Sequence, residues 1–196
     1  MNPGNQVYCP LPLVSGAANM KTFLALFALA FATSTFAQST PTPQAAAPGC
    51  GTDNIKFEVK SDKSQHPLLK PEPGKALIYF LQDDSYFENR PRPTSRFGLD
   101  GKWIGATQAN SYFYFSVDPG EHHLCANWQN FLGVNVAVKS AATHFNAEQG
   151  GSYFFVVSDF YVQHQGPAFM KISQLDNDQA QLLMNRFAFS ASHAKK

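Results

Sequence analysis

The sequence has 196 residues, with 15 basic and 14 acidic side chains and 44% hydrophobic residues. This balance of charge argues against nucleic acid and against an anionic membrane surface as partners, because both select a basic face. A charged fraction of only 15% and 18 phenylalanines favour a sheet-rich fold with aromatic faces over a solvated helical protein.

Residues 20–37 have the three parts of a secretory signal peptide. Lys21 is the only charged residue among the first 37, an apolar run covers residues 23–32, and the small residues Thr35 and Ala37 precede a cut after Ala37. The alternative is a transmembrane anchor, but the run is about half of the ~20 residues that a bilayer requires. We expect an exported chain, periplasmic or secreted, that starts at Met20, with residues 1–19 an over-extended reading frame.

Residues 38–49 are mostly Pro, Ala, Thr and Ser, which predicts a disordered leader. The cut removes one lysine and no acidic residue, so 159 residues with 14 basic and 14 acidic side chains remain. That length suits a single domain with its own core, which we place at residues 50–190.

Cys50 and Cys125 are the two cysteines left after the cut, because Cys9 precedes the signal. An even pair in an oxidising compartment predicts a disulfide, which would close a loop of about 75 residues. Two free thiols are one alternative, and lipidation of Cys50 is another. Lipid attachment ranks below the disulfide, because Cys50 lies far past the apolar run and follows Pro48-Gly49.

The first strands of the domain can be read in chain order. Residues 52–70 are polar, with an apolar alternation at 55, 57 and 59 that predicts one short strand or an arm. Residues 76–81 form an apolar run between turn signals, typical of a central strand covered on both faces. Residues 83–94 predict a long polar loop. Asp100-Gly101 is the strongest hairpin signal in the chain, and it joins predicted strands at 96–99 and 102–106.

The second half of the chain predicts strands at 112–117 and 121–128, with an ambiguous segment at 131–138. Residues 144–148 and 152–159 predict a hairpin around Gly150, and 169–172 a short last strand. Residues 176–187 predict an amphipathic helix, because Ala180, Leu183, Met184 and Phe187 share one helical face and Asp176 or Asn177 can cap it. Residues 193–196 are expected to fray.

This succession of about eight short strands predicts a mainly β fold. We expect a small antiparallel β-sandwich or partly open barrel, with the C-terminal α-helix covering an edge or a face.

Five short motifs occur in a fixed order: GKALIYF (74–80), LDGKWIG (99–105), NSYF (110–113), VDPGEH (117–122) and AEQGGSYF (147–154). In this order they resemble the bacterial domain of unknown function 2846, and the VDPGEH turn is similar to that of PEGA-type β modules. The resemblance covers residues 74–160 and leaves the helix outside. It implies an exported, often lipid-anchored β domain with no catalytic residues to carry over. This chain departs from the family in lacking a convincing lipidation motif.

Three histidines are the candidate metal ligands. His122 and His123, next to Glu121, and His144, near Glu148, are residue types that bind zinc or copper. Neighbours in a strand point to opposite faces, so only one of His122 and His123 is expected to meet His144 across the sheet. Their spacing matches no known metal motif, so we expect no metal or cofactor, and histidines hydrogen-bonded to the backbone instead.

Nothing in the sequence predicts catalysis. There is no Gly-x-Ser-x-Gly elbow, and no cysteine stays free after pairing. Asp83, Asp84 and Glu88 lack the spacing of a calcium loop, so a solvated loop is the better interpretation. We therefore expect no enzyme.

Trp103, Tyr112 and Tyr114 are the candidate ligand-binding residues. Exposed Tyr and Trp rows on β-sandwiches can stack on sugars or present a protein-binding surface. The favoured alternative is that the helix or a second sheet covers them.

We expect a non-enzymatic binding or structural module of the bacterial cell envelope, with an envelope protein or glycan as partner. The second hypothesis is an envelope carbohydrate- or metal-binding protein that uses the aromatic face or the His122, His123 and His144 cluster.

Overall fold

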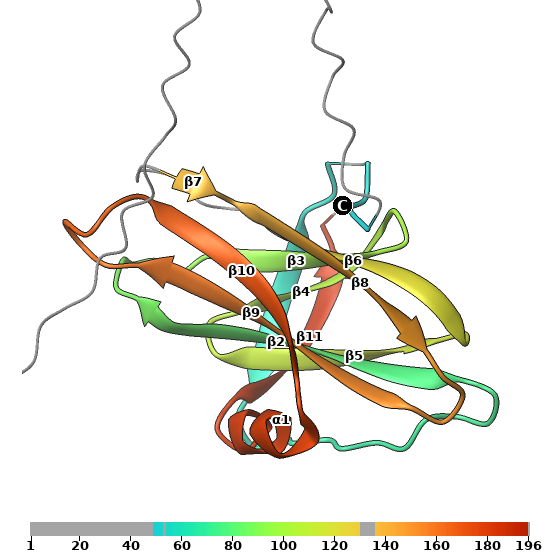
Figure 1. Ribbon diagram of the computed structural model, residues 1–196. Coiled ribbons are helices and arrows are strands. Elements are labelled where there is room, and N and C mark those ends of the chain that lie inside the picture. The colour runs from blue at the N-terminus through green and yellow to red at the C-terminus, as the bar shows by residue number, and fades with distance from the viewer. Residues whose placement is uncertain (1–48, 53, 130–135, 196) are drawn as a thin grey trace, which may run out of the picture. The chain divides into compact units, whose positions relative to one another are not determined.

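The computed structural model describes residues 49–52, 54–129 and 136–195. These residues belong to one compact unit within Pro41–Lys196. The start, signal and leader predicted for residues 1–48 lie outside the described residues. Two β-sheets pack face to face, and a helix, α1 (Asn177–Met184), lies against the outer face of the larger sheet (Figure 1). The predicted β-sandwich with a C-terminal helix is confirmed, and the sheets do not close into a barrel.

The larger sheet has seven strands in the order β1–β11–β5–β2–β9–β10–β7. Their bounds are β1 (Phe57–Asp62), β2 (Ala76–Phe87), β5 (Ser111–Val117), β7 (Val136–Val138), β9 (Ser152–Tyr161), β10 (Ala168–Leu175) and β11 (Ala188–Ala194). Antiparallel pairs (β1/β11, β5/β2, β9/β10) alternate with parallel pairs (β11/β5, β2/β9, β10/β7). Pairing in this sheet is therefore mixed, where the sequence predicts antiparallel neighbours.

The smaller sheet is antiparallel throughout, in the order β4–β3–β6–β8. Its strands are β3 (Thr94–Leu99), β4 (Lys102–Gln108), β6 (Gly120–Trp128) and β8 (Ser140–Ala147). The predicted Asp100-Gly101 hairpin joins β3 to β4, with φ of 49° at Asp100 and 80° at Gly101. Two positive φ angles are what the tightest two-residue hairpin turn requires, and Asp and Gly tolerate them.

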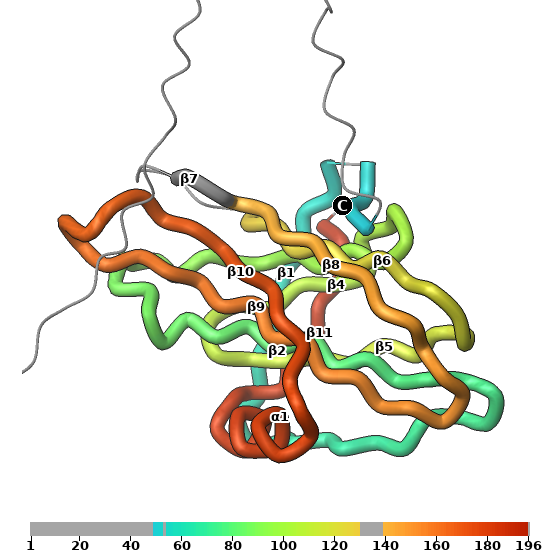
Figure 2. The backbone as a smooth tube through the Cα atoms, viewed as in Figure 1, coloured from blue at the N-terminus to red at the C-terminus, as the bar shows by residue number. Residues whose placement is uncertain are grey.

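The hairpin predicted around Gly150 is wrong. β8 pairs with β6 in the smaller sheet, whereas β9 pairs with β2 and β10 in the larger one. Residues 148–151 therefore carry the chain from one sheet to the other, a crossing that Figure 2 traces. The physical reason lies in β9, whose apolar run Phe154–Val157 is buried on both faces and suits a central strand better than a hairpin partner.

Two other boundaries need correction. β2 extends to Phe87, so the polar loop predicted for 83–94 begins at Glu88, five residues after its expected start. The frayed tail predicted for 193–196 is in part a strand, because β11 reaches Ala194 and pairs with β1. Consequently β10 is not the last strand. β11 has weak strand propensity of its own, and its pairing with both β1 and β5 compensates.

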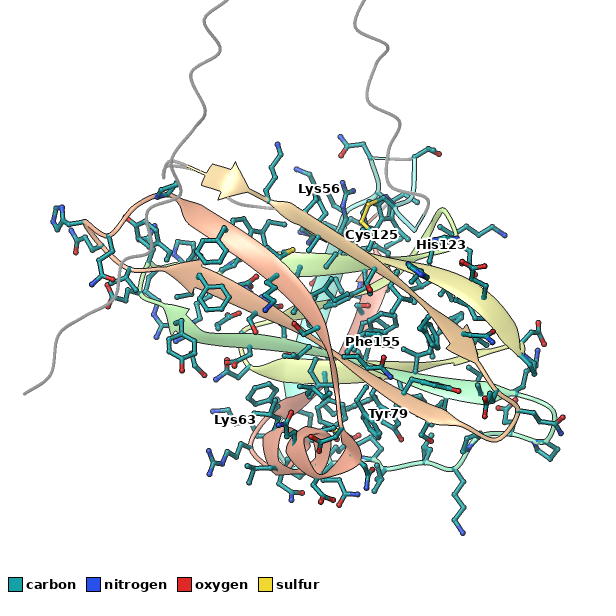
Figure 3. The ribbon with its side chains drawn as sticks, in the orientation of Figure 1. Lys56, Lys63, Tyr79, His123, Cys125 and Phe155 are labelled. Carbon is teal, nitrogen blue, oxygen red and sulfur yellow. A yellow bond between two sulfur atoms is a disulfide. The ribbon has the colours of Figure 1, made fainter. Side chains whose placement is uncertain are left out.

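Strand β2 supplies both apolar layers of the fold. Ile78 and Phe80 face the layer between the sheets, where the Phe80 ring lies 5.1 Å from that of Phe97. Leu77, Tyr79 and Leu81 face the layer under α1. Figure 3 shows Tyr79 on the helix side of β2 and Phe155 of β9 between the sheets. The predicted central strand covered on both faces is confirmed.

Helix α1 forms where the sequence predicts a helix, but it ends before the predicted last residue. Asp176 is the N-cap, and its carboxylate accepts a hydrogen bond from the backbone N–H of Gln179. Ala180 and Met184 are buried against the sheet. The helix ends at Met184, yet Phe187 beyond it still packs in the same apolar layer.

Candidate functional site

Four separate chain segments enclose a surface pocket of about 570 Å³. They are the end of β1 with the following residues, the β2–β3 loop, the β4–β5 turn and the segment from α1 into β11. The lining residues are Ser61, Lys63, Arg90, Pro91, Arg92, Gln108, Ala109, Asn110, Arg186 and Ala188. This volume lies within the range of small-molecule sites.

A row of serines supports the pocket from within the larger sheet. Ser61 of β1 and Ser190 of β11 share a hydrogen bond of 3.2 Å between hydroxyls, and the Ser190 hydroxyl donates to that of Ser111 in β5 at 2.8 Å. The Ser111 hydroxyl donates in turn to the carbonyl of Gln108 at 2.9 Å. The β4–β5 turn is thus tied to the two neighbouring strands.

The opposite wall of the pocket is hydrogen-bonded to a β-bulge in β2. At this bulge the pairing of β2 with β9 shifts between Asp83 and Tyr86. Arg92 Nη1 donates to the Asp84 carbonyl at 2.7 Å, and the Asp84 N–H donates to Asn110 Oδ1 at 2.8 Å. One bulged residue therefore orients two pocket residues from different segments.

The pocket is strongly basic. Its lining contains Lys63, Arg90, Arg92 and Arg186 and no carboxylate. Arg92 Nη1 lies 3.7 Å from Asp84 Oδ2. In the described part of the chain, the other three cations have no ion-pair partner. Because the whole sequence is nearly neutral, this gathering of unpaired cations creates a local positive field that favours anions.

A buried carboxyl pair lies behind Arg92. Asp84 of β2 and Asp159 of β9 are both fully buried. Gln82 Nε2 donates to Asp84 Oδ1 at 2.9 Å and to Asp159 Oδ2 at 2.7 Å, and Trp128 Nε1 donates to Asp159 Oδ1 at 2.8 Å. The solvated loop predicted for Asp83, Asp84 and Glu88 is therefore wrong for Asp84. The bulge turns Asp84 inward, where Gln82 and Arg92 supply its partners.

Burial raises the pKa of Asp84, and burial together with the nearby Asp84 charge raises the pKa of Asp159 well above its ordinary value. Ionising both of two neighbouring buried carboxyl groups costs additional free energy. The pair therefore retains a proton to higher pH than a solvated aspartate does. Neither carboxyl lines the pocket. The contact between the Asp84 carboxylate and Arg92 links the pair to the site.

We predict that Asp159→Asn weakens the pH dependence of stability. A carboxyl whose pKa is raised on folding binds its proton better in the folded state, so stability falls as pH rises from the unfolded pKa to the folded pKa. Asparagine does not titrate in this pH range, so it removes this pH-dependent loss of stability. Its side-chain oxygen can still accept the hydrogen bond from the Trp128 N–H. The measurement is the free energy of unfolding at pH 4 and pH 8, with exposed Asp178→Asn as control. An unchanged pH dependence in Asp159→Asn would contradict the shared proton.

The candidate metal ligands are arranged as strand alternation predicts. His123 pairs with His144 across β6 and β8, with ring centroids 6.0 Å apart. His122 points to the other face, where Nδ1 lies 2.6 Å from Asp100 Oδ2 and Nε2 lies 2.7 Å from the Asp118 carbonyl. Among the described residues, no group of three or more His, Cys, Asp or Glu side chains is placed to hold a metal ion.

His122 and Asp100 tie the β3–β4 turn to β6. Burial opposes the charge of His122, but its bonds to Asp100 and to the Asp118 carbonyl outweigh burial and raise its pKa. Burial likewise opposes the Asp100 charge, and the N–H of His123 with the His122 ring outweighs it and lowers the pKa of Asp100. This ion pair has a structural role within the turn.

The three candidate aromatic residues do not form one face. Trp103 lies in the smaller sheet, where the Arg96 guanidinium carbon sits 4.0 Å from its ring centroid. Tyr112 is fully buried under α1, and the half-buried Tyr114 stacks on Phe189. A stacked row of aromatic rings lies elsewhere, on β2, β9 and β10, where Tyr86 and Phe169 are exposed and the partly buried Phe160 lies between them.

We predict that Tyr112→Phe leaves stability unchanged or raises it by up to about 1 kcal/mol. The Tyr112 hydroxyl is buried and has no hydrogen-bond partner among the described residues, and burial raises its pKa to about 12. The matched control is Tyr79→Phe, because the Tyr79 hydroxyl accepts from the Leu69 N–H at 2.6 Å. That control is expected to lose about 1 kcal/mol in denaturant unfolding. Equal losses in both variants would show that the Tyr112 hydroxyl has a partner such as bound water.

No family model, no curated protein and no solved structure matches this chain. In the described residues, no helix has the length and apolar character needed to cross a membrane. The pocket itself escapes sequence prediction. From the sequence, Arg90 and Arg92 are only members of a predicted polar loop. No sequence pattern marks Lys63 or Arg186 as a binding residue. The only local signal is the cationic Arg90-Pro91-Arg92-Pro93 segment.

Proposed function

We propose that this chain is a non-enzymatic, exported anion-binding module of the bacterial cell envelope. Export is supported by the signal features of residues 20–37 and by the Cys50–Cys125 disulfide, a bond that persists in oxidising compartments. The ordered motifs that resemble the domain of unknown function 2846 support an envelope location, periplasmic or secreted. The anion-binding part of the proposal rests on the basic pocket.

The arrangement of the pocket favours binding over a merely charged surface. Arg92 and Asn110 are hydrogen-bonded to the same residue of β2, so they are held in place before a ligand arrives. Preorganised groups lose little conformational entropy on binding. Arg90 and Arg186 come from segments far apart in sequence and add unpaired charge to the same pocket. Guanidinium groups form charge-assisted, often bidentate hydrogen bonds with carboxylate and phosphate.

The test compares anion binding by the mature chain and by an Arg90→Gln/Arg186→Gln variant. Titrations with inorganic phosphate and with trigalacturonate are followed by calorimetry and by the amide NMR signals of Gln108 and Asn110. Two lost charge-assisted contacts are expected to weaken binding more than tenfold. The control is Lys60→Gln/Lys171→Gln, which removes two exposed charges outside the pocket. The proposal fails if neither anion shifts the pocket signals, or if both double variants bind like the parent.

A further inference from the structure

We infer that the ligand of the basic pocket is an acidic saccharide, meaning a sugar that carries a carboxylate or a phosphate group. This inference rests on the proposed anion-binding function and specifies its ligand class. It is drawn from the size of the pocket, from the side chains between its cations, and from the hydrogen-bonding groups that those side chains leave free.

The size of the pocket indicates a ligand larger than an inorganic ion. A volume of about 570 Å³ falls in the middle of the range for organic ligands. A bare phosphate or sulfate fills only a small part of such a space. Four cations from three of the four lining segments therefore surround room for an anionic group together with a molecular body.

The lining offers polar side chains to that body and only small apolar ones. Apart from the cations, the pocket is lined by Ser61, Pro91, Gln108, Ala109, Asn110 and Ala188. No aromatic ring and no large aliphatic side chain is among them. A nucleobase would find no aromatic ring to stack on, and an acyl chain would find only the small apolar side chains of Pro91, Ala109 and Ala188. These side chains disfavour nucleotides and lipids as ligands.

Two amides are positioned to bind hydroxyl groups. Asn110 uses Oδ1 to accept the Asp84 N–H, which leaves its Nδ2 to donate elsewhere. Gln108 is exposed, and in the described part of the chain its side-chain amide has no hydrogen-bond partner. Amide groups both donate and accept, as sugar hydroxyls do. Amides beside guanidinium groups therefore match a molecule with hydroxyls next to an anionic group.

The buried carboxyl pair keeps Arg92 available to such a ligand. If Asp84 and Asp159 were both ionised, their two negative charges would exceed the single positive charge of Arg92. Burial raises the pKa of both groups, so the pair carries less than its full charge. The one negative charge that a pair with a shared proton keeps offsets Arg92 without exceeding it, and Lys63, Arg90 and Arg186 supply the net positive charge of the pocket.

The experiment titrates the mature chain with four probes: trigalacturonate, glucose 6-phosphate, neutral maltotriose and inorganic phosphate. We expect at least one acidic saccharide to bind at least tenfold more tightly than maltotriose and inorganic phosphate. The comparison of trigalacturonate with glucose 6-phosphate shows whether the preferred anionic group is a carboxylate or a phosphate. Binding is expected to weaken as salt is added, because the pocket charges are near the surface.

The Gln108→Ala variant separates this inference from anion binding in general. It is expected to weaken acidic-saccharide binding about two- to tenfold and to leave inorganic phosphate binding unchanged. The control is Gln174→Ala on the exposed edge of β10. Phosphate binding as tight as that of the saccharides, or equal effects of Gln108→Ala on both, would overturn the saccharide and leave the anion site standing. If no anion binds, both proposals fall.

Discussion

Removing the Cys50–Cys125 disulfide is expected to lower the free energy of unfolding by about 4 kcal/mol. The bond joins residues 75 apart in sequence, so it strongly restricts the unfolded chain. Its Cα atoms lie 5.0 Å apart, within the usual range for a disulfide. Because domains of this size are stable by only about 5–15 kcal/mol, the loss is a large part of the total.

The disulfide also fixes a close contact on the outer face of the smaller sheet. It holds Gly49 and Cys50 across β3 and β6, where Gly98 pairs with Cys125. A side chain at Gly98 would collide with the Gly49 carbonyl. The same segment continues to Ile55, whose carbonyl accepts a 2.8 Å hydrogen bond from Arg96. Without the bond, residues 49–56 are expected to detach first.

The measurement is denaturant unfolding of Cys50→Ala/Cys125→Ala against the oxidised parent, with hydrogen exchange to locate the change. Alanine at both positions avoids a buried free thiol. The reduced parent serves as control, since it lacks the bond and keeps both sulfurs. A loss below about 1 kcal/mol in both forms would show that the unfolded chain is not restricted as the entropy account requires.

Features that depend on neighbouring residues were predictable from the sequence. The Asp100-Gly101 turn, the Asp176 cap and the doubly covered strand around Phe80 each follow from a local pattern, and the structure confirms all three. The opposite orientation of His122 and His123 follows from strand alternation in the same way. In these cases local geometry leaves few alternatives.

Features that depend on distant pairing were not predictable. The Gly150 turn has the residues of a hairpin, yet it connects two sheets, because β9 finds better partners in β2 and β10 than in β8. The bulge in β2 changes which residues face inward, and this converts Asp84 from an expected loop residue into a buried one. The apolar run 154–157 favours a central strand but does not identify the partners of that strand, and no local pattern marks the bulge in β2.

The pocket was hidden for the same reason. Its four cations are separated by up to 123 positions, from Lys63 to Arg186, and no spacing rule connects them. They meet because β1 and β11 pair at one end of the larger sheet, beside the β4–β5 turn. The site is a product of sheet topology.

Replacing Gln82 with leucine is expected to cost about 3–5 kcal/mol of stability. The Gln82 amide is fully buried and holds the polar network together. Its Nε2 donates to both carboxyls and to the Pro93 carbonyl, and its Oε1 accepts from Thr107 at 2.7 Å. Leucine has a similar volume, so no large cavity forms, but both carboxyls and the Thr107 hydroxyl lose a hydrogen-bond partner in the buried interior.

A double-mutant cycle shows whether the cost arises from the carboxyl pair. Gln82→Leu, Asp159→Asn and their combination are compared in denaturant unfolding, with exposed Gln174→Leu as control. The two substitutions are expected to be non-additive, because asparagine at 159 removes the buried carboxyl group to which Gln82 Nε2 donates. Additive effects, or a loss below about 1 kcal/mol for Gln82→Leu, would mean that the carboxyls find other partners. A hydrogen-bond network held together by Gln82 explains how β2 can continue beyond its apolar run and carry Asp84 into the interior. It also explains how Arg92 is held at the pocket.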